Sequence, residues 1–508
     1  MHHYREKSAT GTFDFTLSGY ITLTMSRPHP HLLEISAWPW LARLSAQAGR
    51  TITLANVPEA VWDGISAQGF DQVYLMGVWE RSALGRELAR TDKDLRGEYD
   101  RVLPGWTDED VPGSPYCISA YVPDARMGGW AGLDATRAAL HARRMELIVD
   151  FVPNHTGFDH AWVRSHPDRY VLGDEGDIQA APEDFRRVGG AIVACGRDPY
   201  FAPWRDVAQL NYFNPDTRAG MTGVLREIAS HADGVRCDMA MLVLNDVFER
   251  TWRRVLRDRW PMPADEFWPG ATAAVPTLTF LAEVYWDLEW TLQQQGFDFT
   301  YDKRLLDRLH GSSAHDVRGH LQAEGPFRDR LARFLENHDE ARSAAQLPHR
   351  LSAAATMLAT LPGMRFYFDG QMDGARLRAP VQLGRWPEEP ASPQVRDMYG
   401  RLLKASDDDL FHAGDWQLLG VQPAGDGTSS DLIAWQWLLG DRLAVGVANL
   451  GAGSAQGHVQ LPHLPPGDAW DFEDQLTSSR HRWDRQSIDA RGLYVRLDPG
   501  AAHLLIPR

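Results

Sequence analysis

Four short apolar runs, each ending abruptly in a polar cluster, constrain the fold of this chain more than any other feature. In chain order they are VDFVPNH (149–155), GVRCD (234–238), LAEVY (281–285) and FLENHD (334–339). Strands of a parallel sheet are buried on both faces, so they read as nearly continuous apolar runs. In a closed α/β barrel, the functional residues follow the carboxyl ends of such strands. The pattern therefore predicts parallel strands with a site where they end.

Strand-like and helix-like segments alternate through most of the chain. The expected strands are 32–38, 71–76, 146–152, 234–238, 277–284, 297–301, 331–337 and 364–368. Helical periodicity is found between them at 57–68, 132–144 and 215–231. The helix at 215–231 begins with proline, which is favoured in a first helical turn. Such alternation predicts a parallel sheet, and eight units predict an α/β fold, the (β/α)8 TIM barrel.

Three segments lie outside this barrel, which we assign to residues 30–153 and 212–405. The stretch 154–211 is irregular and far too long for an ordinary loop, so we expect a small insertion domain after the third strand. Short strands separated by Gly-Asp pairs predict an antiparallel β-domain, a β-sandwich, at 406–508. Residues 79–117 are expected to form a long polar loop, and 1–29 a polar, disordered leader.

Composition excludes several classes of protein. The 508 residues include 52 basic and 68 acidic side chains, giving a net charge of −16, which argues against binding nucleic acid or an anionic membrane. No apolar stretch is long enough to span a membrane. The three cysteines lack paired spacing, which excludes a disulfide framework and a zinc site. With no secretory signal pattern at the start, we expect a cytoplasmic protein.

Together, the four segments closely resemble those of the α-amylase family of retaining glycoside hydrolases. The resemblance rests on their order and on the helix-sized gaps between them, and it extends roughly from residue 32 to residue 370, with a looser fit to the C-terminus. It implies the family's barrel, a small domain inserted after the third strand, and a β-domain at the C-terminal end. It also implies an enzyme that cleaves α-glucosidic bonds through a covalent glycosyl-enzyme intermediate.

Retaining hydrolysis needs two carboxyl groups about 5 Å apart, one a nucleophile and the other a general acid and base. Asp238 ends the fourth strand and is the expected nucleophile. Arg236 lies on the same face of the strand, because side chains alternate with a period of two, and it is expected to keep that carboxylate ionised. Glu283 ends an apolar strand, where burial raises a carboxyl pKa, and is the expected acid/base.

The resemblance implies further contacts with the sugar that is cleaved. Asp339 is the third catalytic carboxylate of the pattern, and with His338 it would bind two hydroxyl groups of that sugar. His155 would bind the primary hydroxyl group, and Tyr116 would stack beneath the ring. Arg342 is a further candidate for substrate contact.

Two departures from the family's pattern bear on the ligands. Met241 and Leu242 follow the nucleophile where many α-amylases carry Lys-His, so we expect an apolar contact on the acceptor side, which favours either a small acceptor or a different selectivity. Asn154 corresponds to a calcium ligand in many members, but Gln209 stands where many have an aspartate ligand. Loss of a carboxylate weakens a Ca2+ site, so calcium is doubtful here and no cofactor is expected to be required.

The sequence therefore predicts a glycosidase for oligosaccharides or small α-glucosides, with α-glucans and disaccharides such as trehalose or sucrose among the candidate substrates. Two other enzymatic hypotheses share the fold. A transglycosylase would pass the sugar to another acceptor than water, and a phosphorylase would pass it to phosphate. A non-catalytic carbohydrate-binding or scaffold barrel is the fourth hypothesis, but such relatives generally lack one of the three acidic residues that are present here.

Overall fold

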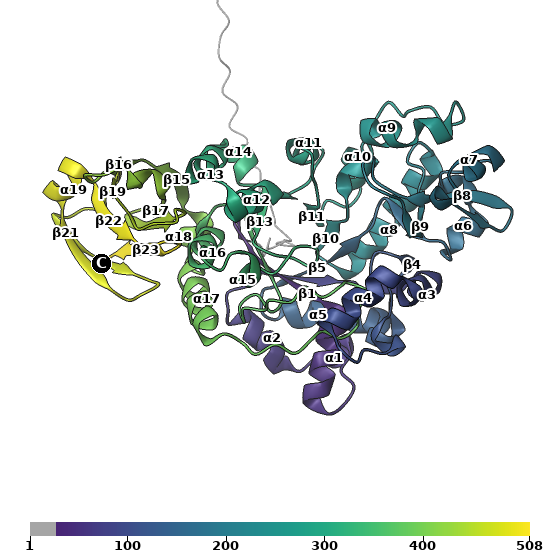
Figure 1. Cartoon of the computed structure of the whole chain (residues 1–508), viewed down its shortest axis with the longest axis horizontal. Helices are drawn as coiled ribbons and strands as arrows, with labels where there is room; N and C mark the ends of the chain where they lie inside the picture. Colours follow the sequence, from purple (N-terminus) through teal and green to yellow (C-terminus); the bar gives the residue numbers. More distant parts are fainter. Residues whose placement is uncertain (1–26) are drawn as a thin grey trace, which may run out of the picture.

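The computed structural model describes residues 27–508, and a closed barrel of parallel strands lies at its centre (Figure 1). The barrel strands are β1 (His31–Ser36), β2 (Gln72–Met76), β5 (Glu146–Phe151), β10 (Gly234–Cys237), β11 (Thr279–Ala282), β12 (Phe299–Tyr301), β13 (Leu331–Phe334) and β14 (Met364–Phe368). Around the ring their order is β1, β14, β13, β12, β11, β10, β5 and β2. Every expected strand is found, so the predicted (β/α)8 fold is confirmed.

Helices cover the outside of the barrel. The main ones are α1 (Ala37–Ala48), α2 (Glu59–Ser66), α5 (Gly129–His141), α8 (Pro215–His231), α9 (Asn245–Leu256), α10 (Phe267–Ala273), α11 (Glu289–Gln294), α12 (Lys303–Gly311), α13 (Ala314–Leu321), α16 (Leu351–Thr360) and α17 (Pro393–Ser406). In α8 the first residue is proline, and the Asn214 side chain caps it by accepting from the Asp216 N–H at 2.9 Å. The first strand ends earlier than expected, because α1 already begins at Ala37.

Inside the barrel an apolar layer lies below a polar one. Leu32, Ile148 and Leu281 belong to one buried cluster between the strands. Period-two alternation puts the residue two positions further along each strand on the same inner face, nearer the carboxyl end. Glu34 and Glu283 are two such residues, and both are buried. The strands thus deliver carboxyl groups to one end of the barrel.

The stretch 79–117 is not the loop that its polarity predicts. It contains β3 (Trp79–Arg81), which pairs with β4 (Ile118–Pro123), and the helices α3 (Ala83–Thr91) and α4 (Lys93–Val102). Each helix has a capping side chain, Ser82 for α3 and Asp92 for α4. Both helices are amphipathic and bury few side chains, such as Tyr99 in α4, so the stretch as a whole has the polar composition of a loop.

The segment predicted as an insertion, 154–211, forms a small antiparallel sheet at the opposite side of the barrel from the C-terminal strands (Figure 1). Its strands, in sheet order, are β6 (His155–Gly157), β9 (Trp204–Gln209), β8 (Ala191–Gly196) and β7 (Phe185–Val188), and its helices are α6 (Ala161–Ser165) and α7 (Glu175–Ala180). Since β6 follows β5 directly, the sheet is rooted at the carboxyl end of a barrel strand.

The C-terminal strands form two antiparallel sheets. One contains β15 (Asp415–Leu419), β17 (Leu432–Leu439), β18 (Arg442–Asn449), β23 (Ala502–Pro507), β20 (Ala469–Asp474) and β21 (Arg480–Asp484), and the other β16 (Val421–Pro423), β19 (Ala455–Val459) and β22 (Leu493–Leu497). Trp435 and Trp437 on β17 are fully buried and donate hydrogen bonds to the side chain and the backbone of Thr360 on α16. These contacts attach the β-domain to the barrel.

Most of the predicted leader, residues 1–26, lies outside the described residues. Arg27, which the same prediction included, forms an ion pair with Asp71 at 2.7 Å. His29 is largely buried and accepts from the Gly363 N–H at 2.9 Å. Residues 27–29 therefore belong to the folded body, which corrects the predicted boundary.

Among the helices of residues 27–508, none combines the length and the apolar character needed to cross a membrane.

Candidate active site

One buried arginine holds two of the predicted catalytic carboxyl groups. Arg236 Nη1 donates to Asp238 Oδ1 at 2.7 Å, and its Nη2 lies 2.9 Å from Glu283 Oε2. Strands β10 and β11 are neighbours in the barrel, with Arg236 in register with Leu281. The carboxyl ends of the two strands therefore bring both acids to opposite nitrogens of the same guanidinium group.

Burial shifts the pKa of both acids, and the protonation of each depends on that of the other. Desolvation raises the pKa of Glu283 to about 7, against the opposing charge of Arg236, and the charges of Asp238 and Asp339 add to the rise. Burial also raises the pKa of Asp238, while the charge and hydrogen bond of Arg236 limit the rise. Near neutral pH, Glu283 is thus able to exist in either protonation state, as a general acid and base must.

Two neighbours fix the orientation of the Glu283 carboxyl group. The Met239 N–H donates to Oε2 at 2.7 Å, and the Tyr285 hydroxyl group donates to Oε1 at 2.9 Å. Met239 has a φ of 42°, a left-handed conformation that is strained for a residue with a side chain. Such strain is often found at functional sites. Tyr285 lies within a sequence segment already singled out, but nothing in the sequence indicated its contact.

His338, Asp339 and Tyr116 form a second group beside the first. His338 Nε2 lies 2.9 Å from Asp339 Oδ2 and 2.7 Å from the Tyr116 hydroxyl oxygen. Its Nδ1 contacts the buried carboxylate of Glu34. Burial alone would lower the pKa of His338, but the charges of Asp339 and Glu34 outweigh it and raise that pKa well above its usual value. Protonated His338 therefore donates from both ring nitrogens.

The positive charge of His338 in turn lowers the pKa of Asp339. Desolvation within the site would raise the carboxyl pKa, but the charge and hydrogen bond of His338, with further help from Arg236, bring the pKa of Asp339 below its usual value. Asp339 is consequently ionised over the whole range in which Glu283 titrates. Its side chain keeps 43% of its surface exposed, so it is available to a ligand.

Three buried polar residues that support the site were absent from the prediction. Glu34 on β1 holds His338, and the Tyr301 hydroxyl group on β12 accepts from Arg236 Nε at 3.3 Å. Asp150 on β5 accepts from the Tyr74 hydroxyl group at 2.5 Å. Glu34 and Asp150 interrupt apolar strands in the sequence, and this interruption is the signal that would have revealed them.

His155 is the first residue of β6 in the insertion sheet. It is 4% exposed, and its ring centre lies 5.3 Å from that of Trp204. Burial lowers the pKa of His155 to about 4, so the imidazole is neutral at neutral pH and has one donor and one acceptor nitrogen. A neutral imidazole of this kind is suited to a hydroxyl group.

The remaining predicted contacts are placed differently. Arg342 is largely engaged within the protein, since its Nη1 donates to Glu336 Oε1 at 2.8 Å and to the backbone oxygen of Asp369 at 2.9 Å. Met241 and Leu242 are 0% and 3% exposed and belong to the main hydrophobic core. Both residues pack in the core, and their apolar contact with an acceptor stays a prediction.

The residues around Asn154 do not fit a calcium ion. Gln209 Nε2 donates to the Asn154 side-chain oxygen at 2.9 Å, to the Asn154 backbone oxygen at 3.0 Å and to the Leu210 backbone oxygen at 3.1 Å. These oxygens, which a hard cation would require, thus already accept from an amide group. Within residues 27–508, no group of three or more His, Cys, Asp or Glu side chains is arranged to hold a metal ion.

Comparisons with known proteins show what this chain resembles. No protein-family model matches the chain. It is 26% identical over 325 residues to the α-amylase MalA of Haloarcula japonica, a match that covers 62% of this chain and 44% of the relative. With α-amylase 3 of Dictyoglomus thermophilum it shares 23% identity over 273 residues, covering 49% and 51%. The resemblance to the α-amylase family is confirmed. The chain spans about half the length of these curated relatives.

Solved structures extend the likeness in fold to nearly the whole chain. The maltogenic α-amylase AmyB of Thermotoga neapolitana superposes with a TM-score of 0.67 at 18% identity, covering 94% of this chain and 99% of that one. An α-amylase of Geobacillus thermoleovorans, solved with acarbose, gives 0.65 at 18% identity, covering 95% and 99%. The α-amylase fold therefore includes the C-terminal β-domain.

Proposed function

We propose that this protein is a retaining α-glycosidase that cleaves α-glucosidic bonds of oligosaccharides or small α-glucosides. The observation that carries the proposal is the Arg236 guanidinium group shared by two buried carboxyl groups, those of Asp238 and Glu283, of which Glu283 has its pKa raised to about 7. Two carboxyl groups in close proximity, one able to hold a proton at neutral pH, are what a double-displacement mechanism requires.

In the first step, Asp238 attacks the anomeric carbon of the bound sugar. Its Oδ1 is held by Arg236, and within the described residues its Oδ2 is free of hydrogen bonds. Protonated Glu283 gives its proton to the glycosidic oxygen as the bond from that oxygen to the anomeric carbon breaks. The products are a glycosyl ester on Asp238, a leaving sugar with a new hydroxyl group, and a Glu283 carboxylate.

In the second step, the Glu283 carboxylate takes a proton from water as the water oxygen attacks the anomeric carbon. The ester bond to Asp238 breaks, its carboxylate is restored, and Glu283 is protonated again. Ionised Asp339, held in place by protonated His338, offers acceptor oxygens to adjacent hydroxyl groups of the same sugar. Such contacts accelerate the reaction if they strengthen in the transition state.

The experiment is to incubate the purified protein with α-glucosides and malto-oligosaccharides and to follow the anomeric protons by NMR. Initial release of the α-anomer supports retention, and release of the β-anomer contradicts it. Asp238→Asn and Glu283→Gln should each abolish turnover. Glu109→Gln, an exposed change far from these carboxyl groups in the sequence, serves as the matched control and should keep the wild-type rate.

Transglycosylation and phosphorolysis share the first step and differ in what resolves the ester. The same incubations with added sugar acceptors or inorganic phosphate distinguish them through longer oligosaccharides or glucose 1-phosphate. Hydrolysis remains our proposal, because Met241 and Leu242, the residues expected to shape an acceptor site, face the core. The Geobacillus relative was solved with acarbose, which makes this compound a suitable inhibitor to try.

We also propose a cytoplasmic location. The three cysteines, Cys117, Cys195 and Cys237, are all buried and free. Buried thiols of this kind suit a reducing compartment. Fractionation of the source cells, with detection of the protein by antibody, would test the location.

A further inference from the structure

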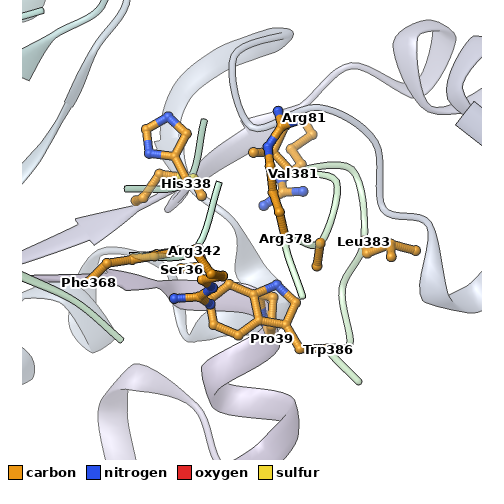
Figure 2. Close-up of a pocket in the computed structure, with 12 residues that line it drawn as sticks. Ser36, Pro39, Arg81, His338, Arg342, Phe368, Arg378, Val381, Leu383 and Trp386 are labelled. Atoms are coloured by element: carbon orange, nitrogen blue, oxygen red, sulfur yellow. The ribbon is translucent and has the colours of Figure 1, made fainter. Parts of the chain in front are cut away.

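A pocket beside His338 lies at the carboxyl ends of β1, β2 and β14. Three arginine side chains line it. Figure 2 shows Arg81, Arg342 and Arg378 with His338 and Trp386 around it. It lies next to the carboxyl groups of the active site, since His338 contacts Asp339 directly. None of the three guanidinium groups takes part in the chemical steps proposed above.

The positive charges in this pocket are only partly neutralised. Arg342 is paired with the buried carboxylate of Glu336 at 2.8 Å. Arg81 is 7% exposed and has no carboxylate within ion-pair distance among residues 27–508. Only its Nη1 makes a hydrogen bond, to the Gly113 backbone oxygen at 2.6 Å, and its buried Nε has no partner. Arg378 is exposed and forms neither an ion pair nor a hydrogen bond with the described residues.

A buried guanidinium group without a carboxylate is costly, and burial lowers the pKa of Arg81 to about 10. The nearest acids do not compensate it directly. Asp124 is paired with Arg126 at 2.7 Å, and Asp150 is occupied by the Tyr74 hydroxyl group. Two unpaired arginines facing one pocket are arranged to receive an anion from outside the protein, because planar guanidinium groups bind phosphate and carboxylate oxygens in pairs.

We propose that this pocket binds an anionic group, a phosphate monoester or a carboxylate, that the carbohydrate substrate carries on the side of the site lined by His338. Arg81 and Arg378 supply the charge. The proposal rests on the proposed function, because it names the class of substrate for the same site.

A second explanation of Arg378 is that it only stabilises ionised Asp339, whose pKa it helps to lower. In that case its removal would slow cleavage of neutral and anionic substrates equally. The two roles are separated by the ratio of kcat/KM for a phosphorylated malto-oligosaccharide to that for its neutral counterpart. We expect Arg378→Gln to reduce this ratio about tenfold, the effect of losing one charge-assisted contact, and Arg378→Lys to restore part of it.

Binding is measured on the full chain by calorimetry with inorganic phosphate, glucose 6-phosphate, glucuronate and glucose. We expect at least one anion to bind about tenfold or more tightly than glucose, with the preference reduced in Arg378→Gln. Arg482→Gln, which removes an exposed charge on β21, is the matched control and should leave the affinities unchanged. The comparison of phosphate, phosphate ester and carboxylate identifies the source of the anion.

The outcomes separate this proposal from the proposed function. Cleavage of neutral glucosides, with anions that bind no better than glucose, would overturn the anion pocket and leave the glycosidase intact. Binding of glucose 6-phosphate that depends on Arg378, without cleavage of any glucoside, would support the pocket and overturn the glycosidase. An unchanged substrate ratio in Arg378→Gln would also refute the pocket. Since Arg378 is exposed, its variants avoid the folding defect that a change at buried Arg81 could cause.

Discussion

Replacing Glu283 by glutamine should change how the stability of the protein depends on pH. The folded-state pKa of Glu283 is raised from 4.5 to about 7, chiefly by burial, so the folded protein binds this proton more tightly than the unfolded chain does. Stability from this proton is therefore fully present below pH 4.5 and is lost as the pH rises through 7. Glutamine cannot titrate, so the variant does not lose this stability as the pH rises.

The magnitude follows from the shift. Each unit of pKa difference between the folded and unfolded states corresponds to about 1.4 kcal/mol, so the wild type loses about 3 kcal/mol between pH 4 and pH 8 through this group. The free energy of unfolding of Glu283→Gln, relative to wild type, should rise by that amount over the same interval. Because Asp238 and Glu283 share Arg236, the pH dependence of stability belongs to the pair. A change of about 3 kcal/mol is therefore the largest that we expect.

The assay is urea denaturation of wild type and Glu283→Gln at pH 4, 5, 6, 7 and 8. Glu109→Gln, an exposed substitution, is the control for removing one carboxyl group and should follow the wild type. A difference in unfolding free energy between Glu283→Gln and wild type that is constant from pH 4 to pH 8 would refute the reasoning. It would mean that the folded protein does not raise the pKa of Glu283, and the assignment of Glu283 as the general acid would lose its physical basis.

Three further predictions test the nucleophile, the calcium argument and the β-domain. Asp238→Asn should lower kcat on any cleaved glucoside by on the order of 10³ or more, measured by product release, with folding unchanged by circular dichroism. EDTA should leave the melting temperature unchanged, whereas Gln209→Ala should cost about 1–3 kcal/mol in urea, because it removes the amide donor from buried oxygens. Gly446→Ala should cost about 1–3 kcal/mol, since its Cβ would lie 2.2 Å from the Trp435 ring, while Gly400→Ala on α17, with open space around it, should be neutral or stabilising in the same assay.

The barrel could be predicted from the sequence because its strands are buried on both faces. Burial on both faces produces the apolar runs, and even the short β12 lay within an expected strand. The helices α3 and α4 were missed for the opposite reason. In α4 only Tyr99 and Val102 are buried, so charged residues dominate the stretch and favoured its interpretation as a polar loop.

The central carboxyl groups could be placed from their positions at strand ends, but their partners could not. Arg236 and Asp238 are two residues apart on one strand, so their contact follows from local geometry. The contact between Arg236 and Glu283 joins two strands and depends on the register of β10 against β11. Glu34 is 304 residues from His338, and no local pattern predicts a pair at that separation. The burial of Met241 could not be predicted either, because its position after Asp238 says nothing about which way the following turn faces.

The charges of the site are balanced in two linked groups, and this balance explains why the acids differ. Two buried carboxyl groups around a single guanidinium group cannot both be neutralised by it, so the pair favours retaining one proton near neutral pH. Asp339 escapes this competition because His338 supplies it with a separate cation, which Glu34 in turn keeps protonated. The Arg236 pair therefore retains a proton, as the proposed mechanism requires, while the third carboxylate stays ionised.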